Sequence, residues 1–127
     1  MDWQIRNDLP IYSQLVWQMK FSIVSGELQP GERISSVREL AVDAGVNPNT
    51  MQRALQELER EGLVFSQRTS GRYVTEDMKM IDDAKLALAD EQIKGFLDAM
   101  ERLGYKKDDI IGMLTKKAGE EREDGKL

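Results

Sequence analysis

The clearest pattern of apolar and polar positions lies between residues 34 and 74, where short apolar stripes are separated by turn residues. Ser36 and Glu39 have the capping-box spacing, in which each side chain satisfies a free amide at a helix start. Gly45 accepts the left-handed conformation that commonly ends a helix. The stripe between them, at helical spacing, consists of Val37, Leu40 and Ala41. The pattern predicts a short helix between Ser36 and Gly45.

A second helix is predicted two residues further along the chain. Asn47 is a favourable N-cap, Pro48 suits the first helical position, and Gly62 ends the helix. Its apolar face consists of Met51, Ala54, Leu55 and Leu58. Two short extended runs follow, residues 63–67 and 72–75, and the Ser-Gly pair between them indicates a hairpin. Residues 33–34 are expected to add a short strand to this hairpin.

Further helices are expected on both sides of this region. Before it, a helix opened by Pro10 should extend to about Ser25, because apolar side chains recur every four positions. After it, one helix is predicted from about Asp77 to Leu103. Another begins near Asp108, where acidic residues suit the first turn. We expect the charged residues 119–127 to fray.

The whole pattern predicts an α+β fold that is mostly α. Residues 1–76 are expected to form a winged helix-turn-helix domain, and residues 77–127 a two-helix dimerisation or effector tail. Two amphipathic helices of this size cannot build a core of their own, so their apolar stripes must pack on the winged domain or on another subunit. We favour a homodimer, because dimers of such domains read two-fold operators.

The proposed dimerisation residues follow an alternating spacing of three and four, continued by one side of the last helix. They are Leu86, Ala89, Ile93, Phe96, Met100, Leu103, Ile110, Ile111 and Leu114. The same stripe has an alternative interpretation, in which it lines a cavity for an unidentified small-molecule effector at the dimer interface.

The start of the second short helix carries polar residues suited to DNA. In a winged helix-turn-helix this end enters the major groove. Asn and Gln side chains can bond adenine edges, and Arg can bond guanine. A hydroxyl and the free amides of the first turn can hold a phosphate. The candidates here are Asn47, Asn49, Thr50, Gln52 and Arg53, although Arg53 could instead pair with Glu57 four residues later.

The order and spacing of many residues between about 9 and 75 resemble the GntR family of bacterial transcription regulators. The matching residues are Pro10-Ile11-Tyr12, Gln14-Leu15, Gly26, Leu28, Pro30-Gly31, Ser36, Arg38, Leu40-Ala41, Gly45-Val46-Asn47, Thr50, Arg53-Ala54-Leu55, Leu58, Glu61-Gly62-Leu63, Arg68, Gly71 and Tyr73-Val74. Ser35 stands where the family usually has Pro, and Thr69 and Arg72 stand where its wing usually has Gly and a small residue.

This resemblance implies further DNA contacts outside the second helix. The family uses the Arg of its Ser-x-Arg motif on DNA, which implies such a role for Arg38; the alternative is a solvated Arg paired with a nearby acid. Arg68, Gly71 and Arg72 are the candidates on the wing. The short tail resembles the YtrA subgroup, whose two-helix tails dimerise and whose members commonly repress ABC-transporter genes.

Composition narrows the remaining functions. The 127 residues include no cysteine, which excludes disulfides, thiolate zinc sites and cysteine nucleophiles, and no histidine, the commonest metal ligand and general base. We therefore expect no enzyme activity, no cofactor and no metal, and a cytoplasmic protein without membrane contact. The net charge of −5 argues mildly against DNA, so a winged-helix protein-interaction module is the alternative function. The proposed DNA face nevertheless carries local positive charge, which suffices for phosphate contacts and predicts salt-sensitive, modest non-specific binding. Its five arginines are Arg33, Arg38, Arg53, Arg68 and Arg72.

Overall fold

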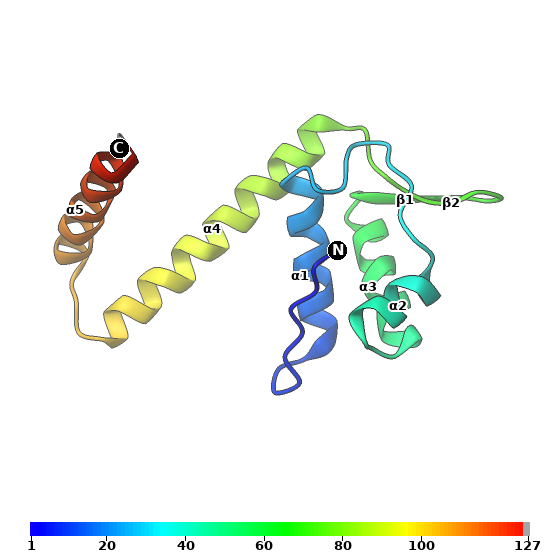
Figure 1. The fold of residues 1–127 in the computed structure, drawn as a ribbon, viewed down its shortest axis with the longest axis horizontal. Coiled ribbons are helices and arrows are strands. Elements are labelled where there is room, and N and C mark those ends of the chain that lie inside the picture. The colour runs from blue at the N-terminus through cyan, green and yellow to red at the C-terminus, as the bar shows by residue number, and fades with distance from the viewer. Residues whose placement is uncertain (126–127) are drawn as a thin grey trace. The chain divides into compact units, whose positions relative to one another are not determined.

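A computed structural model of the protein describes residues 1–125 and confirms the predicted mostly α, winged helix-turn-helix fold. Three helices, a two-stranded hairpin and two further helices follow one another along the chain (Figure 1). They are α1 (Ile11–Val24), α2 (Val37–Ala44), α3 (Pro48–Arg60), β1 (Val64–Gln67), β2 (Gly71–Val74), α4 (Met78–Arg102) and α5 (Lys107–Gly125).

The predicted signals at the start and end of α2 are present. The backbone N–H of Glu39 donates to Ser36 Oγ at 3.2 Å, which caps the helix. The Ser36 hydroxyl donates in turn to the Glu39 carboxylate at 2.9 Å. Glu39 therefore binds the side chain of Ser36, whereas the capping box predicted a bond to its backbone amide. Gly45 ends the helix with a φ of 69°.

The main hydrophobic core lies between α1, α2, α3 and the hairpin. The predicted apolar face of α3 is fully buried and packs with residues from all of these elements. Lys20 of α1 also forms an ion pair with Glu61, just after α3, at 2.6 Å. The main buried side chains are Leu15, Met19, Ile23, Ile34, Leu40, Met51, Leu55, Leu58, Leu63, Val64 and Val74. This packing fixes the direction in which α3 presents its polar side.

The hairpin pairs β1 and β2 as antiparallel strands, from Val64 opposite Val74 to Gln67 opposite Gly71. Arg33 bridges to Tyr73, and the Ile34 amide donates to the Arg72 carbonyl at 2.9 Å. The segment expected to add a short strand therefore does pair with the wing. In Figure 1 the turn of the hairpin projects past α2 and α3.

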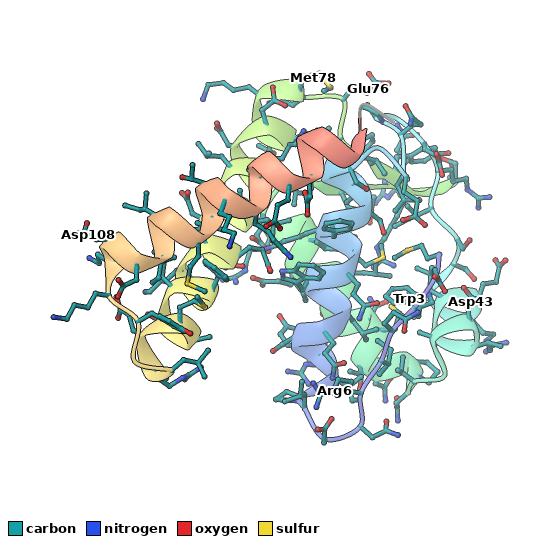
Figure 2. All side chains as sticks on the ribbon, turned by 60° about the vertical axis from the view of Figure 1, so that its left-hand side comes forward. Trp3, Arg6, Asp43, Glu76, Met78 and Asp108 are labelled. Carbon is teal, nitrogen blue, oxygen red and sulfur yellow. The ribbon has the colours of Figure 1, made fainter. Side chains whose placement is uncertain are left out.

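The first nine residues are held against α1. The side chain of Gln18 exchanges hydrogen bonds of 2.9 and 2.8 Å with the backbone of Gln4. The side chain of Gln14 does the same with the backbone of Arg6, at 2.7 Å in both directions. Trp3 lies on this segment beside α1 (Figure 2) and packs against the core. The first nine residues are therefore part of the folded domain.

The chain divides into two compact units, Met1–Ala87 and Leu88–Leu127. The first unit extends into α4 because Ile81 is buried in its core and Met80 and Ala84 pack beside it. The expected boundary after residue 76 coincides with the start of α4, but as a division of function it stays a prediction. Helix α5 continues to Gly125, so the fraying expected from residue 119 is not seen there. The last two residues lie outside the described part.

Within residues 1–125, none of the helices combines the length and the apolar character that a membrane span needs. The same residues contain no group of three or more acidic side chains placed to hold a metal ion.

Candidate nucleic-acid interface

The start of α3 is built by Asn47, whose side-chain oxygen accepts from the Asn49 amide at 2.8 Å. The Asn47 carbonyl accepts from the amides of Thr50 and Met51 at 3.0 and 3.1 Å. Pro48 has no amide hydrogen to offer. The first-turn amides that we expected to hold a phosphate are therefore already bonded, and the polar groups left at this end are side chains. Asn47 and Asn49 are exposed, and Thr50 is half-buried.

Arg53 lies one turn further along α3 and is exposed. Its guanidinium carbon is 4.9 Å from the centre of the Tyr12 ring, a cation–π arrangement between α3 and the first turn of α1. The alternative pairing with Glu57 is wrong, because the carboxylate of Glu57 is bound by Arg60. Tyr12 therefore holds the Arg53 side chain at the edge of the helix start.

Beyond its first turn, α3 contacts the wing through polar side chains. On the wing side, Arg72 of β2 donates through Nε to Glu59 Oε1. Its Nη2 atom lies 3.5 Å from Gln52 Oε1. The side chain of Arg72 is only 19% exposed, and that of Glu59 is 30% exposed. Gln52 and Arg72, both predicted to contact DNA, are thus brought together, but with Arg72 bound to a carboxylate.

This arrangement shifts the pKa of Glu59. Partial burial raises its pKa, but the hydrogen bonds from Ser66 and Arg72 and the charge of Arg72 lower it, and the net pKa is below its ordinary value. The pKa of Glu57 is also lowered, chiefly by the hydrogen bond from Arg60. Both carboxylates therefore carry a negative charge at neutral pH.

The tip of the wing brings together the remaining wing candidates. Gly71 has a φ of 112°, a conformation that residues with a Cβ rarely adopt. Arg33 Nε donates to the Ser70 carbonyl at 2.6 Å. This bond ties the turn of the hairpin to the segment that precedes α2. Arg68 is exposed at the tip, and Arg38 is exposed on the first turn of α2. The candidates thus fall into four groups: the α3 start, the pair of Gln52 and Arg72, the wing tip, and Arg38.

Sequence reasoning missed the contributions of Tyr12 and Glu59. Tyr12 stands 41 positions before Arg53 in the chain, so no local spacing relates the two residues. Its place in the Pro10-Ile11-Tyr12 motif was the available signal. Glu59 is not among the predicted site residues, because its pairing with Arg72 depends on how the hairpin folds back on the helix.

Residues 11–74 match the family described as bacterial regulatory proteins, gntR family. The chain belongs to the GntR family. It is a DNA-binding transcription regulator and not an enzyme.

Relatives and solved structures of the GntR family resemble this chain over different lengths. The HTH-type transcriptional repressor YtrA of Bacillus subtilis (strain 168) is 41% identical over 90 residues, which cover 70% of this chain and 69% of that protein. A GntR family transcriptional regulator from Listeria monocytogenes is 37% identical with a TM-score of 0.80, covering 88% of this chain and 98% of that chain. AraR(DBD) in complex with operator ORX1 is 26% identical with a TM-score of 0.51, covering 59% of this chain and 92% of that chain.

Proposed function

We propose that this GntR-family chain is a homodimeric repressor that binds a two-fold operator. The observation that carries the proposal is the start of α3, where exposed Asn47 and Asn49 stand beside an Arg53 side chain oriented by Tyr12. The buried face of α3 is fully packed, so this end keeps a fixed position on the domain. A rigid element with polar side chains at its N-terminal end suits major-groove entry.

The proposed roles differ between the candidate residues. Arg53 reads a base edge, because it is exposed and held in one orientation by an aromatic ring. Thr50 and Arg68 contact the DNA backbone, since one carries a hydroxyl at the helix start and the other a cation at the wing tip. Arg38 takes the same kind of backbone contact from α2. Asn47 and Asn49 face base edges or phosphates beside Arg53.

Dimerisation is assigned to the tail, residues 77–127. Its apolar stripe includes Leu86, Ile93, Phe96, Leu103, Ile111 and Leu114, all exposed large hydrophobic side chains. Leaving so many apolar side chains in water is unfavourable, and a second copy would cover them. Ile110 differs from the rest of the predicted stripe, because it is already buried within the chain. Residues 1–76 then act as the DNA-binding domain.

The names of two relatives support repression and operator binding as the function. YtrA of Bacillus subtilis carries the name of a transcriptional repressor, and AraR(DBD) has been seen with operator DNA. We extend both features to this chain, with the cytoplasm as the place where it acts. The resemblance to the YtrA subgroup further suggests an ABC-transporter operon as the regulated genes.

The test is a fluorescence-anisotropy titration with DNA from upstream of the protein's own gene and a shuffled duplex of equal length. Arg53→Ala should lower affinity for the upstream DNA by about 1–3 kcal/mol. Arg60→Ala is the matched control, because it removes the same charge from the exposed C-terminal end of α3. Equal losses in the two variants would contradict a base-reading role for Arg53. No binding to either duplex at low salt would favour the protein-interaction module.

A further inference from the structure

The contact between α3 and the wing pairs the carboxylate of Glu59 with Arg72, a cation that was predicted to contact DNA. Glu59 Oε1 accepts from Arg72 Nε and from Ser66 Oγ, the latter at 2.6 Å. Ser66 and Arg72 are directly opposite each other in the hairpin, so both side chains leave the same face of the wing. That face is turned towards α3, and the stacked rings of Phe65 and Tyr73, 5.8 Å apart, lie on the other face.

A guanidinium binds carboxylate and phosphate oxygens through the same donors. The Arg72 side chain is mostly covered, and its second donor group points to Gln52 on the same helix. Arg72 is therefore held on the helix side of the wing, and its charge is neutralised within the protein. The lowered pKa of Glu59 agrees with a carboxylate that stays ionised beside this cation.

We propose that Glu59 limits sequence-independent DNA binding by holding Arg72 away from the DNA backbone. This inference rests on the proposed function, because it assumes that the wing and α3 face DNA. Each cation that meets a phosphate steepens the salt dependence of binding. Glu59 thus removes one such contact from a chain whose wing would otherwise present Arg72 beside Arg68.

The test compares variants on the shuffled duplex, with affinity measured by anisotropy at several salt concentrations. Glu59→Gln keeps a hydrogen-bonding side chain but no charge, and so releases Arg72. The slope of log affinity against log salt should steepen by about 0.9, so that the affinity ratio between 50 and 200 mM salt grows roughly three- to fourfold. Glu59→Gln/Arg72→Gln should return to the wild-type slope.

Glu57→Gln is the matched control for net charge. Glu57 lies on the same helix and is paired with the exposed Arg60, so its replacement changes the charge equally without releasing Arg72. An equal steepening in Glu57→Gln, or a gain that persists in the double variant, would overturn the role of Glu59. A wild-type protein that binds neither the upstream nor the shuffled duplex would overturn the proposed function together with this inference.

Discussion

The N-cap of α3 allows the stability of the helix and the binding of DNA to be changed in opposite directions. Asn47 accepts a hydrogen bond from the Asn49 amide at 2.8 Å, and aspartate can make the same bond. Its negative charge would also interact favourably with the helix dipole, which adds about 0.3–1 kcal/mol to the free energy of unfolding. Asn47→Asp should therefore raise the melting temperature by about 1–5 °C.

The same charge should weaken DNA binding. If the start of α3 faces the DNA backbone, the new carboxylate repels the phosphates, and we take a charge separation of about 6 Å to work out the magnitude. At effective dielectric constants of about 20–60 this repulsion costs about 1–3 kcal/mol. Operator affinity should then fall roughly 5- to 150-fold.

The assay pairs thermal unfolding with an operator titration at one salt concentration. Asn47→Ser is the control, since it keeps a capping oxygen and adds no charge. Both variants remove the Asn47 amide, but only Asn47→Asp adds a charge, so we expect Asn47→Asp to lose more operator affinity than Asn47→Ser while melting higher. An Asn47→Asp protein that is stabilised and binds the operator as tightly as wild type would refute the placement of this helix end on DNA.

Three further predictions concern the core, the wing and the tail. Leu55→Ala should lower the free energy of unfolding by about 2–5 kcal/mol in urea titrations, because the side chain is fully buried; a loss below about 1 kcal/mol would contradict that packing. Folding lowers the pKa of Glu59, so its stabilising contribution is present above its ordinary value of 4.5 and is lost as the pH falls through the lower folded value. The stability difference between wild type and Glu59→Gln should accordingly shrink between pH 5 and the acid limit, and a constant difference would argue against the ion pair. Ile93→Glu should convert the protein to a monomer in sedimentation velocity, whereas an unchanged dimer would place the interface elsewhere.

Local rules predicted most of the fold of the first unit. The Ser36 cap, the Asn47-Pro48 start and the hairpin turn are each set by neighbouring residues, so their signals can be read along the chain. Family resemblance then assigned the order of these elements to a winged helix-turn-helix, which the structure confirms.

The candidate interface was less predictable because its side chains are positioned by distant partners. Arg53 depends on Tyr12 from another helix, and Arg72 depends on Glu59 across the hairpin. The first-turn amides of α3 failed as a phosphate site for a local reason, since Asn47 binds them itself. Composition could not show that Arg72, one of five arginines assigned to the DNA face, is neutralised by a neighbour.

We propose that this chain reads a two-fold DNA sequence, and selection from a random duplex pool is the most direct test of that proposal. The 127-residue protein would be mixed with the pool at physiological salt, and the bound duplexes would be sequenced over successive rounds. We expect enrichment of one inverted repeat, with half-sites about 10 base pairs apart centre to centre. A pool without enrichment, or one enriched only in single unrepeated half-sites, would contradict it.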